Sequence, residues 1–183
     1  MPTTPDAPPD PGLSARRRWT DAVPLTLLTL TVDFLTKAVV WALAVPGVRY
    51  DVIGDVLRLR LVENTLLGFS IPLPGLPGRW SYSALIVAGL ALVVAGYRRT
   101  LPHERLPRAS LVLVGAGGLA NLVERVLTGG VTDFISVGIG LRRWPTFNAA
   151  DIAVSIGIAT YLSGAWSRGG WRGLLVGGSR GPK

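Results

Sequence analysis

Four long apolar blocks, separated by segments rich in charge, proline and glycine, dominate the pattern of hydrophobic and polar positions along the chain. They cover about residues 22–45, 82–97, 109–127 and 147–166. Each block is close to the length of helix that crosses a hydrocarbon core of about 30 Å at a rise of about 1.5 Å per residue. The pattern therefore predicts a membrane all-α bundle of four transmembrane helices.

The first block also has features of a cleaved signal peptide, because Ala42, Leu43 and Ala44 form a small-residue pattern of the kind found at cleavage sites. The apolar region of a signal peptide, however, is only about 7 to 15 residues long and uncharged. This block is longer and contains Asp33 and Lys37. We therefore favour a membrane span and keep a cleaved leader as the alternative.

The connection between the first two blocks, about residues 46–80, is long enough to hold structure of its own. Leucines alternate with arginines over residues 57–61, the period-two pattern of a half-buried β-strand. Proline and glycine are frequent in residues 71–78 and predict turns. We expect a small extracytoplasmic β element here, which could cover one end of the bundle together with the second outer loop, about residues 128–146.

Composition agrees with a chain solvated largely by lipid, since 49% of its 183 residues are hydrophobic and only 16% are charged. Residues 1–18 are rich in proline, aspartate and threonine before a run of arginines, and predict a disordered cytoplasmic tail. Residues 19–167 form the predicted membrane domain. Residues 168–183 form a basic tail that we expect to face the inner leaflet.

The net charge of +8 predicts topology rather than a nucleic-acid partner, because the basic residues lie between apolar blocks and not on one soluble face. Cytoplasmic loops carry the excess of lysine and arginine. The distribution predicts a multi-pass protein of the cell (plasma or inner) membrane with both termini in the cytoplasm. The predicted cytoplasmic set is Arg16, Arg17, Arg18, Arg98, Arg99, Arg105, Arg108, Arg168, Arg172, Arg180 and Lys183, and the opposite set is Arg49, Arg58, Arg60, Arg79, Arg142 and Arg143.

Several kinds of catalytic machinery are excluded by the residues that the chain lacks. It has no cysteine and a single histidine, so it offers no thiolate nucleophile and no Cys-based or His-based metal cluster. That histidine, His103, lies on the predicted inner connection, across the membrane from Asp133, which argues against a Ser-His-Asp triad. H-E-x-x-H, G-x-S-x-G and glycine-rich phosphate loops do not occur in the sequence. Carboxylates remain as candidates.

Ionisable groups inside the predicted spans cost about 2.5 to 3.5 kcal/mol each on insertion scales, so each needs a partner or a function. Asp33 and Lys37 share a helix face at i,i+4 and can form a structural ion pair. Asn121, Glu124 and Arg125 share a face of the third span, after two glycines that permit close helix contact. We interpret both groups as supporting networks.

Asp133 and Asp151 differ from these groups, because the predicted topology brings them to one membrane face from the two sides of a short loop. One interpretation is structural, with Asn148 as the N-cap of the fourth span and Asp151 in its first turn. The other is catalytic. Two carboxylates in a poorly solvated site share a proton. The ionised one can activate water while the protonated one polarises a carbonyl and later protonates the leaving amine.

Five motifs in chain order add to this hypothesis: V-D-F-L-T-K, E-N-T-L-L-G-F-S, G-G-L-A-N-L-V-E-R, G-G-V-T-D-F and F-N-A-A-D. Over about residues 32–157 the chain resembles bacterial lipoprotein signal peptidase, also called signal peptidase II. The matching positions are Asp33, Lys37, Glu63, Asn64, Thr65, Phe69, Ser70, Gly117, Gly118, Asn121, Arg125, Asp133 and Asp151.

The resemblance implies an aspartic endopeptidase that removes signal peptides from prolipoproteins, cleaving before a diacylglyceryl-modified cysteine. It implies Asp133 and Asp151 as the catalytic pair, and neither a cofactor nor a metal. The implied supporting residues are Asp33, Lys37, Asn64, Asn121, Arg125 and Asn148. We expect membrane lipid and the lipidated substrate as partners, and a monomeric enzyme.

The chain also departs from the usual family motifs. Leu66 and Leu67 replace small residues, Ala120 replaces a glycine, Glu124 replaces an aspartate, and Phe34 stands where glutamine is common. Two alternatives follow. One is an inactive relative that binds lipoproteins or an inhibitor without cutting them. The other is a small proton-coupled transporter, suggested by the intramembrane charges, although no internal repeat is visible.

Overall fold

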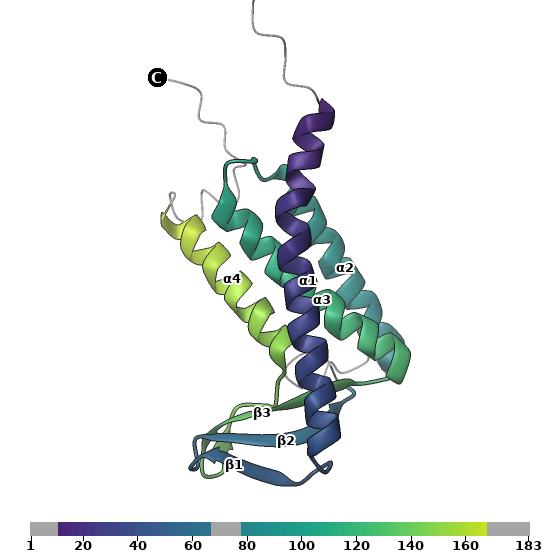
Figure 1. The fold of residues 1–183 in the computed structure, drawn as a ribbon, viewed down its shortest axis with the longest axis vertical. Coiled ribbons are helices and arrows are strands. Elements are labelled where there is room, and N and C mark those ends of the chain that lie inside the picture. Colours follow the sequence, from purple (N-terminus) through teal and green to yellow (C-terminus); the bar gives the residue numbers. More distant parts are fainter. Residues whose placement is uncertain (1–10, 67–77, 168–183) are drawn as a thin grey trace, which may run out of the picture.

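A computed structural model describes residues 11–66 and 78–167 as a helical bundle with a small sheet at one end (Figure 1). The predicted tail residues 168–183 lie outside the described part, as do Leu67, Phe69 and Ser70. The helices are α1 (Pro11–Leu43), α2 (Gly78–Arg99), α3 (Arg105–Thr128) and α4 (Ala149–Ser167), and the strands are β1 (Arg49–Ile53), β2 (Leu57–Asn64), β3 (Val131–Ile139) and β4 (Arg142–Arg143).

The four predicted spans are confirmed, since all four helices are long and apolar enough to cross a membrane. Their surfaces are inverted relative to those of a soluble bundle. Phe34, Leu92 and Leu127 are each more than 70% exposed, whereas Asp33 and Lys37 are buried. Apolar side chains facing outward need a hydrocarbon solvent, and buried polar side chains need partners within the bundle. The fold is therefore that of a membrane helical protein.

Helix α1 corrects the predicted boundary of the N-terminal tail. Residues 11–18, expected to be disordered, belong to this helix. Alanine and arginine in this stretch favour a helix, and a proline at the first helical position, here Pro11, loses no hydrogen bond. The helix is also packed into the bundle: Asp33 Oδ1 accepts a hydrogen bond from the Ala150 N–H at 2.9 Å. This contact joins the first span to the start of α4.

The sheet is larger than the expected β element and draws strands from both connections. Its order is β1-β2-β3-β4, with antiparallel neighbours. The predicted strand at residues 57–61 is confirmed as part of β2, but residues 128–146 were expected to be a loop and contain β3 and β4. The first residues of β3 are buried without alternation, so the sequence carried no period-two signal. The pairing of β2 with β3 draws the two connections together under the bundle.

Two glycines allow α3 and α4 to pack closely. A Cβ atom added at Gly117 would lie 2.5 Å from the Ala150 carbonyl oxygen. One added at Gly157 would lie 2.6 Å from the Ser110 carbonyl oxygen and 2.8 Å from Val114 Cγ2. Without side chains at these positions, the helix backbones approach one another as they commonly do in membrane bundles. The expectation that the third span uses glycine for close contact is confirmed.

We predict that Gly157→Ala destabilises the protein in detergent by about 1 to 3 kcal/mol, because the added methyl group overpacks the contact between α3 and α4. Gly89→Ala is the matched control, since a Cβ atom at this α2 position meets nothing within 4 Å. The control should be neutral or more stable by up to about 1 kcal/mol. Thermal unfolding measures both, and equal melting temperatures would contradict the packing argument.

Candidate active site

The N-terminus of α4 is held by a reciprocal pair of hydrogen bonds. Asn148 Oδ1 accepts from the Asp151 N–H at 3.0 Å, and Asp151 Oδ2 accepts from the Asn148 N–H at 3.2 Å. This is the geometry of a capping box, in which each side chain satisfies the other's backbone donor. The structural interpretation of Asn148 and Asp151 is thus correct. It leaves Asp151 Oδ1 free for a second contact, with Asn121.

Asp133 lies on β3 and is 1% exposed. Its Oδ2 accepts from Asn64 Nδ2 at 2.9 Å, and its Oδ1 accepts from Asn148 Nδ2 at 2.8 Å. Burial and, secondly, the negative charge of Asp151 raise the pKa of Asp133 to about 7, although the two amide donors and the Lys37 ammonium act to lower it. Asp133 therefore holds a proton over much of the range up to neutral pH.

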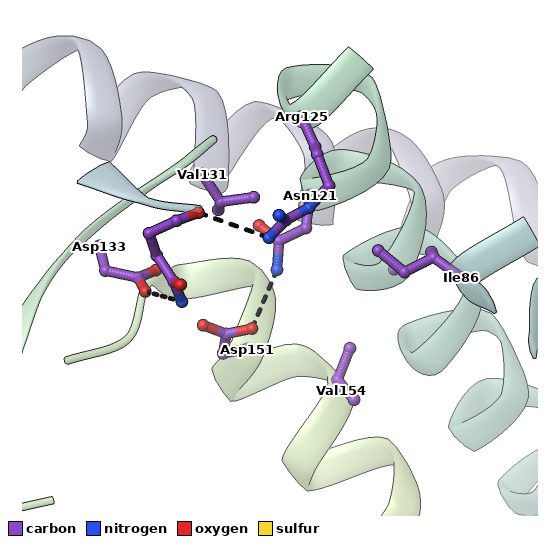
Figure 2. A pocket seen from close by; sticks show the side chains of 9 residues that line it. Ile86, Asn121, Arg125, Val131, Asp133, Asp151 and Val154 are labelled. Atoms are coloured by element: carbon purple, nitrogen blue, oxygen red, sulfur yellow. Dashed lines mark hydrogen bonds between the residues drawn. The ribbon is translucent and has the colours of Figure 1, made fainter. Parts of the chain in front are cut away.

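The two carboxylates line one cavity of about 170 Å³. Asp133 and Asp151 lie beside one another there, and Asn121 donates a hydrogen bond to Asp151 (Figure 2). Asn148 contacts both acids, through its amide group on Asp133 and its backbone N–H on Asp151. The structure thus brings together the two acids that the sequence placed at opposite ends of a loop.

An ion-paired lysine supports this pair from α1. Lys37 Nζ lies 2.7 Å from Asp33 Oδ2, 2.8 Å from Glu124 Oε2 and 3.1 Å from Asn121 Oδ1. The contact with Asn121 is a hydrogen bond, and the contacts with the two carboxylates are ion pairs. Asn121 links Lys37 to Asp151, because its Nδ2 donates a hydrogen bond to Asp151 Oδ1 at 2.9 Å. The predicted pairing of Asp33 with Lys37 is confirmed. The pair also contacts α3 through Lys37 and α4 through Asp33.

Arg125 lines the cavity, but its hydrogen bonds go to backbone. The guanidinium donates to the Thr65 carbonyl at 3.1 Å and also to the Leu66 carbonyl. Leu66 in turn donates its N–H to Asn64 Oδ1 at 2.9 Å. Arg125 therefore fixes the turn that orients Asn64, whose amide group holds Asp133. These contacts use the backbone of residue 66, so the leucine there does not remove them.

Sequence reasoning missed the apolar wall of the cavity. Ile86 of α2, Val131 of β3 and Val154 of α4 line it with Gly118. Val154 carried a usable signal, since it lies three residues after Asp151 and so on the same helix face. Ile86 carried no signal, because its place depends on how α2 packs. The cavity thus combines two buried acids, several amide groups and an apolar wall.

This arrangement suits hydrolysis of an amide bond. Two acids that share a proton can supply a base for water and a hydrogen-bond donor for a carbonyl at the same time. The apolar wall can bind an aliphatic stretch of substrate beside them.

Comparisons with known proteins identify the family of this chain. The sequence profile of the family described as Signal peptidase (SPase) II matches residues 25–166. The lipoprotein signal peptidase of Burkholderia thailandensis is 31% identical over 134 residues, which is 73% of this chain and 80% of that protein. The lipoprotein signal peptidase of Moorella thermoacetica is 32% identical over 158 residues, which is 86% of this chain and 95% of that protein.

Two solved structures described as bacterial membrane enzymes share the fold. One has a TM-score of 0.72 at 21% identity, covering 88% of this chain and 94% of that one. The other has a TM-score of 0.68 at 24% identity, covering 78% of this chain and 90% of that one. With the profile match over most of its length, this chain belongs to the signal peptidase II family and is a membrane peptidase of the aspartic type.

Proposed function

We propose that the chain removes signal peptides from prolipoproteins by cleaving before a diacylglyceryl-modified cysteine, with Asp133 and Asp151 as the catalytic pair. The observation that carries this proposal is the single cavity that both carboxylates line, each held by asparagine amides. Family membership supports the substrate class. The enzyme acts as a monomer in this proposal, since one chain supplies the acids and their supporting residues.

In the proposed reaction, Asp151 is the general base. Its place in the first turn of α4 and its contact with the Asn148 N–H stabilise a negative charge. Asp151 takes a proton from water as the oxygen attacks the scissile carbonyl carbon, while Asp133 donates a hydrogen bond to the carbonyl oxygen. The C–N bond then breaks, and Asp133 gives its proton to the leaving nitrogen. The proton on Asp151 returns to Asp133 before the next cycle.

The position of the pair suits a substrate that stays in the bilayer. Asp151 lies at the start of a span and Asp133 on the adjoining strand, so both acids sit near one end of the apolar helices. In the proposed topology this end faces outward across the inner membrane and the sheet is extracytoplasmic. The arginines of the inner connection and the tails, as counted from the sequence, support this orientation. A lipid-anchored cysteine would then reach the cavity sideways, between helices.

We predict that Asp133→Asn and Asp151→Asn each lower the cleavage rate of a diacylated prolipoprotein by about 10² to 10⁴ fold, because each removes one member of the acid–base pair. Purified variants in detergent, with mass spectrometry of the products, provide the measurement.

Asp51→Asn is the matched control for these variants, since this aspartate is part of β1 and its side chain is 46% exposed. It should cut at close to the parent rate. A parental rate in either Asp133→Asn or Asp151→Asn, with an unchanged melting temperature, would reject the catalytic pair. A parent that binds the substrate without cutting it would favour the inactive relative.

The pH profile of cleavage should show a falling limb above about pH 7. Asp133 donates a proton in this mechanism, and its pKa is raised to about 7. Below that pH the donor form is present, and above it the rate should drop about tenfold per pH unit as the pair loses its last proton. Initial rates from about pH 5 to about pH 9 test this. A rate that still rises at the upper end would contradict a carboxylic acid as donor.

The orientation can be tested with single cysteines, because the parent chain has none. Val52→Cys is on an exposed position of β1, and His103→Cys is at an exposed position between α2 and α3. A membrane-impermeant maleimide should label Val52→Cys after the outer membrane alone is opened, and His103→Cys only after the inner membrane is lysed. The reverse order of labelling would overturn the proposed topology.

A further inference from the structure

The Glu124 side chain on α3 contacts both α1 and β3, and it has no role in the proposed reaction. Its Oε2 lies 2.8 Å from Lys37 Nζ on α1. Its Oε1 accepts from both the backbone N–H and the hydroxyl of Thr132, at 3.0 Å and 2.5 Å. One carboxylate on α3 is therefore held by α1 on one side and holds the start of β3 on the other.

Thr132 immediately precedes Asp133, and each of its polar groups is engaged. Besides the two contacts to Glu124, its hydroxyl accepts from Trp41 Nε1 at 3.0 Å. Its carbonyl accepts from Asn148 Nδ2 at 3.2 Å, the same amide nitrogen that lies 2.8 Å from Asp133 Oδ1. The residue is 4% exposed. Its backbone is thus fixed to α3 and α4 one residue before the acid.

We propose that Glu124, acting through Thr132, is a positioning residue that sets the place of the Asp133 carboxyl group relative to Asp151. The inference rests on the proposed function, because it concerns the geometry of the same pair. It assigns to Glu124 neither contact with substrate nor proton transfer.

The reach of the glutamate side chain matters to this role. Lys37 and Thr132 occupy different oxygens of one carboxylate, so the group must lie between α1 and β3. The additional methylene, relative to the aspartate usual in the family motif, lets a residue of α3 extend to the strand. Trp41 and Thr132 complete a polar chain in this protein that runs from α1 to the strand carrying Asp133.

We expect loss of this positioning to lower the rate of cleavage rather than the affinity for substrate. A shift of about 1 Å in a reacting group can lower the rate about 10² fold, whereas substrate held elsewhere in the cavity still binds. Releasing Thr132 should also move the two acids apart and weaken the repulsion that favours the protonated pair. Within residues 11–66 and 78–167, the charged groups that act on the Asp133 carboxyl group are Asp151 of α4, Lys37 of α1 and Arg125 of α3. None of them is altered by a change at Thr132.

The experiment uses the full chain in detergent with a diacylated prolipoprotein. Thr132→Val keeps the side-chain shape but removes the hydroxyl, and should lower kcat about tenfold or more with KM within about twofold. The falling limb of its kcat profile should move to lower pH. Thr132→Ser keeps the hydroxyl and should restore kcat to within about twofold of the parent. Glu124→Gln should lower kcat similarly, and the double variant should lose less than the product of the two single losses.

Thr29→Val is the matched control, because it removes a buried threonine hydroxyl that donates only within its own helix, to the Leu25 carbonyl at 2.8 Å. It should leave kcat and the pH profile unchanged. The proposal is overturned if Thr132→Val keeps the parent kcat, if Thr132→Ser is as impaired as Thr132→Val, or if the losses at Glu124 and Thr132 multiply independently. Thr132→Val decides the matter should Glu124→Gln fail to fold.

Failure of the proposed function is recognised separately. If the parent does not cut, or still cuts with Asp133→Asn, the function fails whatever Thr132 does. Amide hydrogen exchange at residues 131–134 then tests the positioning role without a measurement of activity. Exchange should be faster in Glu124→Gln than in the parent, and unchanged exchange would overturn the inference.

Discussion

The structure depends on keeping two carboxylic acids side by side in a site from which water is largely excluded. Asp133 and Asp151 repel when both are ionised, so the fold must surround them with donors. Asn148 meets much of that requirement alone, because it caps α4 and also touches both acids. A helix cap and an acid pair are thereby the same structural unit. The structural and catalytic interpretations of the F-N-A-A-D motif are compatible.

The second constraint is the cost of burying charge within lipid, and the bundle meets it by connecting the charges. Asp33, Lys37 and Glu124 form one ion-paired cluster, and each also bonds a group on another element. A buried ion pair alone contributes little net stability. Its hydrogen bonds to the Ala150 and Thr132 backbone N–H groups instead fix where α4 and β3 begin. In this protein, polar contacts hold together the end of the bundle next to the sheet, and close contacts at glycines hold α3 against α4.

Much of this could be predicted from sequence, for identifiable reasons. A transmembrane helix requires a long apolar segment, so the sequence predicted all four helices. The i,i+4 spacing of Asp33 and Lys37 was enough to predict their ion pair. The β3 strand was missed because a strand buried on both faces does not alternate. The contacts of Arg125 were also hidden, since a guanidinium that binds backbone carbonyls at residues 65 and 66 leaves no mark in the sequence there. The roles of Thr132 and Trp41 depend on a strand pairing that only the structure supplies.

Two departures from the family motifs, Phe34 and Leu66, can be explained by which of their atoms make contacts. Phe34 is 72% exposed on the outer surface of α1, where an apolar side chain suits lipid. Leu66 supplies a backbone carbonyl to Arg125 and a backbone N–H to Asn64, and any residue other than proline keeps both groups. Side-chain contacts to the two acids come instead from Asn64, Asn121 and Asn148, which keep the family residues. At positions 34 and 66, therefore, the departures leave the contacts of the acid pair in place.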